Sequence, residues 1–250
     1  MAVVLAAGAG SRLRPLTDLL PKALCPVGGA PLLDLAVTRA QVATGAVAVN
    51  VHHGRAAMEA HLAEPRFAGV HVSVEEPEAL GTAGALGNLK PWIDGRAVLV
   101  VNVDAWHGAD LAPFTEGWDG DRVRLLTVSD RVRGTWGDRR YAGAALLPWP
   151  HVVRLPASPA GLWEASWRHL VPGGDLDLVL HDGPFFDCGT PAGYLAANLV
   201  ASGGRPVIGG GAVVDGRVEG SVVWAGARVE RGEHLRAAVR ATAGVTVLVR

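Results

Sequence analysis

The sequence predicts an α/β fold with a doubly wound, mixed sheet, followed by a small β-rich tail. Short apolar runs alternate with segments of helical periodicity, which is typical of strand–helix units in such a sheet. The first apolar run ends in a glycine-rich turn, as in domains that bind phosphate. Near residue 205 the helical periodicity stops and glycine and valine dominate. The chain should therefore divide at about residue 204 into a large domain and a tail.

Unbroken apolar runs such as AVLVV indicate strands that are buried on both faces. Between the early runs, the pattern predicts helices, with Pro31 at a first helical position and Gly45 after a helix end. The predicted helices cover residues 31–43, 55–64 and 83–89. The predicted strands cover residues 2–7, 46–51, 70–74, 97–103, 123–128 and 142–147.

The tail, residues 205–250, shows a six-residue recurrence. Val223, Val229 and Leu235 are spaced by six residues, which suggests coils of a parallel β-helix with these side chains inside. Val218 is out of phase with this spacing. A β-hairpin tail packed on the main domain is the alternative. Exposed strand edges in the tail could pair between copies, which would give a homodimer.

Composition excludes several function classes. The 250 residues are 49% hydrophobic, which suffices for a full core, and the net charge is −1 with no basic block. Binding to nucleic acid or to an anionic membrane therefore has no electrostatic support. No apolar stretch approaches a membrane span, and Cys25 and Cys188 form no CxxC pair. We expect a soluble, cytoplasmic protein with reduced thiols.

The strongest motif is LAAGAGSRLRPLTDLLPKAL, residues 5–24. Glycines at 8 and 10 let the backbone approach a phosphate closely. The guanidinium of Arg12 can bind phosphate oxygens, and Lys22 follows in a loop constrained by prolines. Leu13 replaces the last glycine of a dinucleotide fingerprint, and no GK[ST] of a Walker A loop is present.

The whole string resembles the signature LAAGxGxRLxPxTxxxPKxL of sugar-1-phosphate nucleotidyltransferases, and the resemblance extends over roughly residues 2–200. It implies a Rossmann-like domain of the nucleotide-diphospho-sugar transferase type over 1–204, and a short left-handed β-helix-like module over 205–250. Further segments that carry the resemblance are EEPEALGTAGAL (75–86), VVNVDAW (100–106), YAGAALL (141–147) and FFDCGTPAGYLAAN (185–198).

The resemblance implies a reaction in which a sugar 1-phosphate attacks the α-phosphorus of a nucleoside triphosphate in line, and pyrophosphate leaves. Both reactants are anions, so a divalent cation is needed to neutralise charge. Mg²⁺ prefers hard oxygen ligands, and the resemblance assigns Asp104 and Asp187 to it. Two carboxylates on one Mg²⁺ should lie within about 6 Å of each other.

The resemblance also assigns roles to other residues. Lys22 would screen the two reacting phosphates, and Arg12 would stabilise the leaving pyrophosphate. Gly143 and Thr190 would contact the sugar, although Thr190 could instead cap a helix. The residues expected to bind the nucleotide are Leu5, Ala6, Ala7, Gly8, Gly10, Glu76, Gly81, Thr82, Ala83 and the neighbouring Gly84.

The sequence departs from the family pattern between the two aspartates. Many relatives carry a Glu-Lys-Pro segment there, whereas this chain has SDRVRGTWGDRRY at 129–141. Arg139 or Arg140 could supply the missing charge, although an exposed basic turn is the better interpretation. Val103 stands where relatives often have glycine, so the identity of the sugar is open.

The nucleobase also stays open. Residues 49–67 resemble N-acetylmuramate-1-phosphate uridylyltransferases, whereas the LGTAGAL loop and the tail resemble mannose-1-phosphate guanylyltransferases. UTP and GTP are therefore both candidates. His52 and His53 lack a clear third ligand, so a packed or solvent-facing pair is expected rather than a metal site.

Two other function classes compete with a transferase. A nicotinamide-dependent oxidoreductase would use the GxG turn, but Leu13 and the following PKAL argue against it. A non-catalytic regulatory paralogue would be expected to lose charge at Arg12, Lys22, Asp104 and Asp187, and all four are intact.

Overall fold

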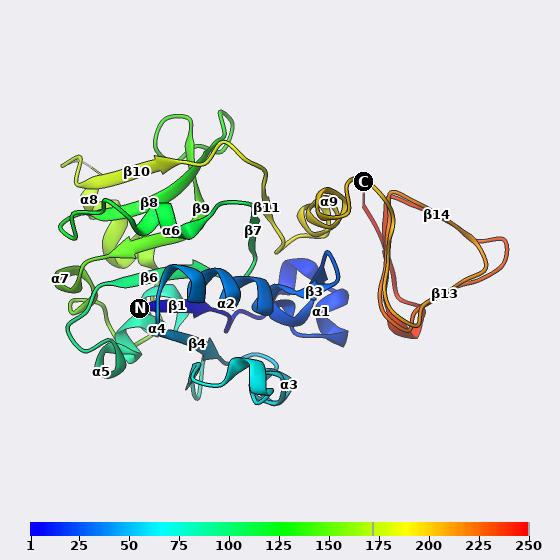
Figure 1. Ribbon diagram of the computed structural model, residues 1–250, viewed down its shortest axis with the longest axis horizontal. Helices are drawn as coiled ribbons and strands as arrows, with labels where there is room; N and C mark the ends of the chain where they lie inside the picture. The colour runs from blue at the N-terminus through cyan, green and yellow to red at the C-terminus, as the bar shows by residue number, and fades with distance from the viewer. Residues whose placement is uncertain (172, 250) are drawn as a thin grey trace. The chain divides into compact units, whose positions relative to one another are not determined.

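The computed structural model describes residues 1–171 and 173–249. These residues form two compact units. The first contains Met1–Gly8 and Leu35–Pro184, and the second contains Ala9–Asp34 and the chain from Phe185 onward. Figure 1 shows the course of the chain through both units.

A seven-stranded sheet is the framework of the first unit, with the order β10-β8-β9-β6-β1-β4-β5. β1 lies between β4 and β6 and is parallel to both, and β10 is parallel to β8. Only β9 runs antiparallel to its neighbours, β6 and β8, among the described strands of this sheet. The predicted mixed α/β domain with a largely parallel sheet is confirmed. The strands are β1 (Ala2–Leu5), β4 (Val47–Val51), β5 (His71–Val74), β6 (Val98–Asn102), β8 (Val123–Ser129), β9 (Arg139–Leu147) and β10 (Leu176–Leu180).

The six predicted strands are all present, but the sequence pattern missed β10. Its sequence LDLVL is interrupted by Asp177, so it lacks the unbroken apolar run. The carboxylate of Asp177 accepts a hydrogen bond of 2.6 Å from Nε of Arg124 on the neighbouring β8. This ion pair allows a charged residue in a half-buried strand.

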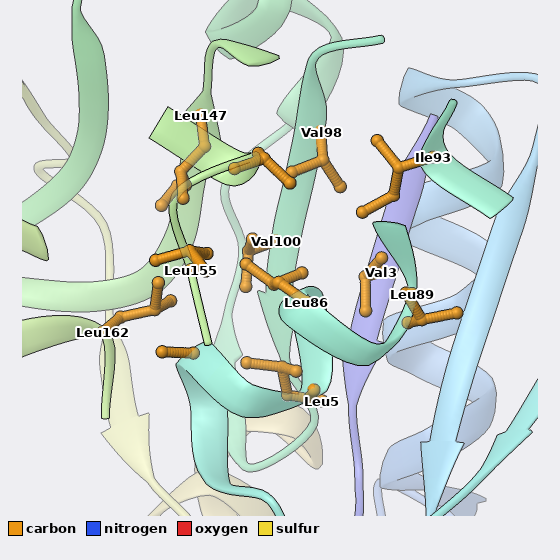
Figure 2. Packing of buried hydrophobic residues seen from close by; sticks show 14 of the residues in the cluster. Val3, Leu5, Leu86, Leu89, Ile93, Val98, Val100, Leu147, Leu155 and Leu162 are labelled. Atoms are coloured by element: carbon orange, nitrogen blue, oxygen red, sulfur yellow. The ribbon is translucent and has the colours of Figure 1, made fainter. Parts of the chain in front are cut away.

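The core of the first unit forms where helices cover the sheet (Figure 2). Leu86, Leu89 and Ile93 of the α4–α5 segment belong to one buried cluster with Val3 and Val100 of the central strands. The glycine-rich stretch of α4 allows this helix to pack closely in the core. The helices that lie wholly in this unit are α3 (Arg55–Leu62), α4 (Gly81–Asn88), α5 (Lys90–Ile93), α6 (Leu111–Thr115), α7 (Trp149–Val152) and α8 (Arg168–Leu170). The predicted first helix is α2 (Leu32–Ala43), which begins one residue after Pro31, and a short strand β7 (Ala105–His107) follows β6.

Helix α9 organises the second unit. The buried Tyr194 of α9 donates its hydroxyl hydrogen to the carbonyl oxygen of Pro26 at 2.5 Å, and Asn198 accepts a bond of 3.2 Å from the amide of Gly28. The indole of Trp224 in the tail donates to the Tyr194 hydroxyl at 3.0 Å. The elements before the tail are α1 (Leu16–Leu19), β2 (Pro26–Val27), β3 (Ala30–Pro31), β11 (Phe185–Asp187) and α9 (Pro191–Ala201).

The tail strands stack in parallel ladders. β12 pairs with β15 and β15 with β18, while β13 pairs with β16 and β14 with β17. Each of these ladders is parallel, and among the described tail strands only β19 pairs antiparallel, with β18. The strands are β12 (Val207–Ile208), β13 (Val213–Val214), β14 (Arg217–Glu219), β15 (Val222–Val223), β16 (Arg228–Val229), β17 (His234–Arg236), β18 (Ala238–Arg240) and β19 (Thr246–Leu248).

The six-residue recurrence places Val223, Val229 and Leu235 on the successive strands β15, β16 and β17. All three are buried, whereas Val213 on β13 is 41% exposed. The predicted boundary at residue 204 falls between α9 and β12. None of the helices in the described part of the chain is long and apolar enough to span a bilayer.

Candidate active site

The residues that follow β1 form hydrogen bonds with the neighbouring chain at the carboxyl end of the sheet. The amide of Ala6 donates to Oδ1 of Asn50 at 2.6 Å, and Nδ1 of His53 lies 2.9 Å from the carbonyl oxygen of Ala7. Ala6 and Ala7 are both buried and directly follow the last residue of β1. The predicted nucleotide-binding residues Leu5, Ala6, Ala7 and Gly8 thus lie at the carboxyl end of the central strand, where ligands of open α/β sheets bind.

Gly10 and Lys22 approach each other closely in the second unit. Gly10 adopts a left-handed conformation with φ of 64°, which favours glycine. A Cβ atom at this position would lie only 2.9 Å from Cβ of Lys22 and 2.8 Å from Cγ2 of Thr17. Thr17 also donates its hydroxyl to the Gly10 carbonyl oxygen at 3.0 Å. The loop therefore returns Lys22 to the glycine turn, as the proline spacing predicted.

A Gly10→Ala substitution should lower activity by displacing the Lys22 segment, beyond the strain of a positive φ that costs about 1–2 kcal/mol. Gly95→Ala is the matched control, because Gly95 also has a positive φ of 77° but no atom within 4 Å of an added Cβ. Thermal unfolding and kcat/KM should be measured for both. If both variants kept the same specific activity, the close packing of Gly10 against Lys22 would not be needed for catalysis.

Arg12 and Asp187 form an ion pair in the second unit. Nη1 of Arg12 lies 3.2 Å from Oδ2 of Asp187, and the two side chains are 63% and 36% exposed. The other carboxylate oxygen of Asp187 accepts a bond of 2.8 Å from the Gly189 amide. Arg12 lies in the 3₁₀ turn Ser11–Leu13, so both predicted charged residues reach solvent on the same unit.

Thr190 caps the helix that follows Asp187. Its hydroxyl oxygen accepts a hydrogen bond of 3.2 Å from the amide of Gly193, at the start of α9. A side chain at Gly193 would collide with the carbonyl oxygen of Asp187, which explains the glycine in this motif. Of the two roles predicted for Thr190, the cap is thus present, and contact with a sugar stays a prediction.

Asp104 follows β6 in the first unit. The amide of Val103 donates to the carbonyl oxygen of Leu5 at 3.2 Å, which places the Asp104 turn beside the end of β1. Arg39 of α2 donates to the carbonyl oxygens of Ala105 and His107 at 3.0 and 3.1 Å. These bonds fix the backbone on both sides of Asp104.

Gly143 lies against the residue that follows Asp104. Gly143 has a φ of 84°, and an added Cβ would lie 2.0 Å from Cβ of Ala105, so only glycine fits. Two residues earlier, burial raises the pKa of the Tyr141 hydroxyl, and the negative charge of Asp104 raises it further. The buried Tyr141 hydroxyl has no hydrogen-bond partner among the residues that the structure describes. Tyr141 was not among the site residues predicted from the sequence, because an aromatic residue in a strand is usually part of the core.

The glycines of the predicted base loop pack against another backbone segment. A Cβ at Gly81 would lie 2.6 Å from the carbonyl oxygen of Ala160, and one at Gly84 would lie 2.4 Å from that of Ser158. The amide of Ala83 donates to the Ala160 oxygen at 2.9 Å, and the hydroxyl of Thr82 accepts from the Leu162 amide at 2.8 Å. These residues therefore have a packing function, and their contact with a base stays a prediction.

Two acidic neighbours precede this loop and differ sharply. Glu76, predicted to bind the base, is exposed and forms an ion pair with Arg55 at the start of α3. Glu75 is 1% exposed, and its carboxylate accepts hydrogen bonds from the side chain of Asn50 and from the amide of Leu80, both at 2.8 Å. Glu75 and Asn50 were not predicted from the sequence, because acidic and amide side chains are normally exposed.

The remaining charged and polar candidates have structural partners. Nδ1 of His52 lies 2.8 Å from the Glu75 carbonyl oxygen, and the His52 and His53 rings meet edge to face. His52 is half-buried and His53 is exposed, within the range of the packed or solvent-facing pair that the sequence predicts. Arg140 forms an ion pair of 2.9 Å with Asp130, and Arg139 lies 3.9 Å from Asp138.

Carboxylate oxygens are the ligands available for a divalent cation. Within residues 1–171 and 173–249, no cluster of three or more His, Cys, Asp or Glu side chains could hold a metal. Mg²⁺ needs few protein ligands, and the half-exposed carboxylate of Asp187 offers the hard oxygen that it prefers. Asp104 and Asp187 belong to different units, so their predicted sharing of one ion stays a prediction.

The amino-acid sequence of the chain is similar to those of known nucleotidyltransferases. The family model described as "Nucleotidyl transferase" matches residues 1–127. An N-acetylmuramate alpha-1-phosphate uridylyltransferase of Caulobacter vibrioides is 36% identical over 230 residues, which cover 79% of this chain and 95% of that protein. A mannose-1-phosphate guanylyltransferase of Mycobacterium tuberculosis is 35% identical over 144 residues, which cover 57% of this chain and 39% of that protein.

Solved structures support the fold. A glucose-1-phosphate thymidylyltransferase of Bacillus anthracis matches with a TM-score of 0.68 at 21% identity, covering 80% of this chain and 94% of that one. A UDP-glucose pyrophosphorylase of Acinetobacter baumanii matches with a TM-score of 0.65 at 19% identity, covering 80% and 92%. The family model and the sequence relatives show that the chain belongs to the nucleotidyl transferase family, as an enzyme of the sugar-1-phosphate nucleotidyltransferase class.

Proposed function

We propose that this enzyme condenses a nucleoside triphosphate with a sugar 1-phosphate to give an NDP-sugar and pyrophosphate. The phosphate oxygen of the sugar attacks the α-phosphorus, and the bond to the β-phosphate oxygen breaks. The nucleophile is already ionised, so catalysis consists of positioning and charge stabilisation. The observation that carries the proposal is the tight contact of Gly10 with the Lys22 segment inside the intact family signature.

The charged residues then have separate roles. Lys22 screens the repulsion between the attacking and the attacked phosphates, and Arg12 binds the departing pyrophosphate. No covalent intermediate is required. Burial raises the pKa of the Cys25 thiol to about 12, so this neighbour of Lys22 stays protonated and is a poor nucleophile.

We propose Mg²⁺ as the cofactor, held by Asp104 and Asp187. When bound, it supplies positive charge to the triphosphate oxygens. The backbone around Asp104 is fixed from both sides by the Val103 and Arg39 bonds. Asp187 is fixed by the Gly189 amide and by the close packing of Gly193. Carboxylates held in this way suit a cation that tolerates little distortion of its coordination.

UTP is the nucleotide that we favour, with GTP as the alternative. The uridylyltransferase of C. vibrioides is similar over 79% of this chain, and the guanylyltransferase of M. tuberculosis over 57%. For the same reason, N-acetylmuramate 1-phosphate is the first sugar phosphate to test and mannose 1-phosphate the second. Gly143 and Thr190 are the residues that we assign to the sugar side.

A pyrophosphate-release assay tests the proposal. UTP, GTP, dTTP, CTP and ATP should each be combined with a panel of sugar 1-phosphates, in the presence of Mg²⁺ and of EDTA. Release of pyrophosphate that depends on both substrates and stops with EDTA is expected. Absence of release with every combination would contradict the proposal and would favour a non-catalytic paralogue.

We also propose that residues 205–250 form a short β-helix that supports α9 and contributes to assembly as a homodimer. The parallel ladders and the buried Val223, Val229 and Leu235 support a coil with an apolar interior. The exposed side chains of Ile208 and Val213 lie on the first coil, where a second copy could cover them.

Truncation after Gly204 should leave turnover measurable but lower the stability. The fragment loses Trp224, whose indole bonds the buried Tyr194 hydroxyl, and an apolar face is uncovered. Turnover, thermal unfolding and size in solution should be compared for residues 1–204 and the full chain. Trp224→Phe is the matched control, since it keeps the tail and removes one hydrogen bond worth about 1 kcal/mol. A folded but inactive fragment would mean that the tail builds part of the site.

A further inference from the structure

A buried polar chain connects the end of the first strand to the segment that precedes α4. The amide of Ala6 donates to Oδ1 of Asn50 at 2.6 Å, and Nδ2 of Asn50 donates to Oε1 of Glu75 at 2.8 Å. Oε2 of Glu75 then accepts from the amide of Leu80 at 2.8 Å. Asn50 and Glu75 are 3% and 1% exposed, so water does not compete for these groups.

The strand extension after Asn50 makes a second connection between the same two segments. Nδ1 of His53 lies 2.9 Å from the Ala7 carbonyl oxygen, and Nδ1 of His52 lies 2.8 Å from the Glu75 carbonyl oxygen. The sequence NVHH thus contacts the backbone at Ala6 and Ala7 on one side and Glu75 on the other. All of these residues lie in the first unit.

We infer that Asn50 and Glu75 are positioning residues that hold the nucleobase loop in register with the end of the first strand. The inference rests on the proposed function, because the reaction needs a bound nucleoside triphosphate. Leu5–Gly8 at one end of the polar chain, and Glu76 and Gly81–Gly84 at the other, are the residues predicted to bind it. A nucleotide that contacts both segments needs their spacing to be fixed. The hydrogen bonds of the polar chain fix this spacing, because each of them needs a donor on one side and an acceptor on the other.

A merely structural role would not require this chemistry. A buried carboxylate is costly, and apolar residues of similar size often give equal or greater stability. Hydrogen bonds, in contrast, specify direction and distance, and a loss of about 1 Å in positioning can cost about 100-fold in rate. The second carboxylate oxygen of Glu75 accepts a hydrogen bond from the amide of Leu80, the residue directly before Gly81. The chain therefore ends at the start of the loop rather than in the hydrophobic core.

The direction of each bond gives a decisive experiment. Glu75→Gln places an amide group against either the Asn50 amide or the Leu80 N–H, so one donor faces another donor. Asn50→Asp places a second carboxylate against Glu75. The double substitution N50D/E75Q reverses the donor and the acceptor between the two side chains. The new carboxylate at position 50 can then accept from Ala6 and from the new amide at position 75, and the remaining oxygen of that amide accepts from Leu80.

We expect each single variant to lower kcat/KM for the nucleoside triphosphate by about 10- to 100-fold. The KM for the sugar 1-phosphate should change little, and the double variant should recover most of the loss. Glu116→Gln is the control, because it makes the same change at an exposed residue of the same unit, outside the segments assigned to the nucleotide, and it should leave both KM values unaltered. Circular dichroism and thermal unfolding should accompany the kinetics.

Several results would overturn the inference. It fails if the single variants unfold at lower temperature but keep wild-type kinetics while folded, since the pair then contributes only to stability. It also fails if the double variant is as impaired as the singles, or does not fold. If a single variant does not fold, the double variant decides alone, since a folded and active double variant supports the inference.

A binding measurement separates this inference from the proposed function. Calorimetric binding of UTP and of GTP should be measured for wild type, both single variants and the double variant. A wild-type protein that binds a nucleotide but turns over none would contradict the proposed reaction only. The positioning role would then still be judged by weaker binding in the singles and its recovery in the double variant. If no variant changed nucleotide affinity, the positioning role would be wrong.

Discussion

Replacing Lys22 by alanine should lower kcat/KM by about 100-fold or more, since a charge that acts on the reacting phosphates contributes most as they approach. The position of Lys22 beside Gly10 supports this role, because the lysine segment packs closely against the glycine turn. Initial rates of pyrophosphate release at varied concentrations of each substrate provide the measurement. The melting temperature should change little, because a half-buried lysine contributes little to the core.

Two companion variants make the Lys22 result interpretable. Lys22→Arg should recover activity poorly, because a planar guanidinium does not replace a compact ammonium group. Arg14→Ala removes a neighbouring exposed cation that forms an ion pair with Asp18, and it should retain activity. Near-normal kcat/KM in Lys22→Ala would refute the assigned role. An equal loss in Arg14→Ala would instead indicate a general effect of positive charge in this segment.

Asp104→Asn should remove most turnover and leave the fold intact. An amide keeps the size of the side chain but carries no charge, so the affinity for Mg²⁺ should fall and the triphosphate should lose charge compensation. The bonds that fix this turn come from backbone groups of Val103, Ala105 and His107, and they do not involve the substituted atoms. Turnover should be measured over a wide range of Mg²⁺ concentrations together with thermal unfolding.

Asp121→Asn provides the control for this change, because Asp121 is an exposed acidic residue of the same unit. It should keep the activity and the Mg²⁺ dependence of the wild type. An Asp104→Asn enzyme that reached wild-type turnover at ordinary Mg²⁺ concentration would exclude Asp104 as a metal ligand. Asp187→Asn should resemble Asp104→Asn if both carboxylates hold the same ion.

Local patterns were sufficient to predict much of the fold. Strands that are buried on both faces tend to have unbroken apolar sequences, which can be recognised without the structure. All six strands predicted in this way are present. β10 escaped detection because Asp177 interrupts its apolar run, and the stabilising Arg124 lies 53 positions away. The ladder pairing of the tail also depends on contacts between coils. The recurrence of Val223, Val229 and Leu235 did not indicate which strands would pair.

The candidate site shows the same limit. Sequence alone predicted Gly10, Arg12 and Lys22, because their motif is contiguous. It did not reveal that Gly81 and Gly84 pack against the backbone of residues 158–160, since this contact joins distant segments. Glu75 and Asn50 were missed for a related reason. An acidic residue beside another acidic residue suggests an exposed turn, and only the folded chain shows that one is buried with an amide partner.

The Arg12–Asp187 ion pair has a consequence for how the enzyme loads its ligands. Arg12 and Asp187 pair with each other, so a phosphate on Arg12 and a metal on Asp187, as proposed, would each have to separate this ion pair. Exposed ion pairs contribute only about 0–1 kcal/mol, so either ligand can separate this one at little cost. Whichever arrives first leaves the opposite group vacant for the second. Metal and nucleotide would thus show heterotropic cooperativity, and each would raise the affinity for the other by the same factor.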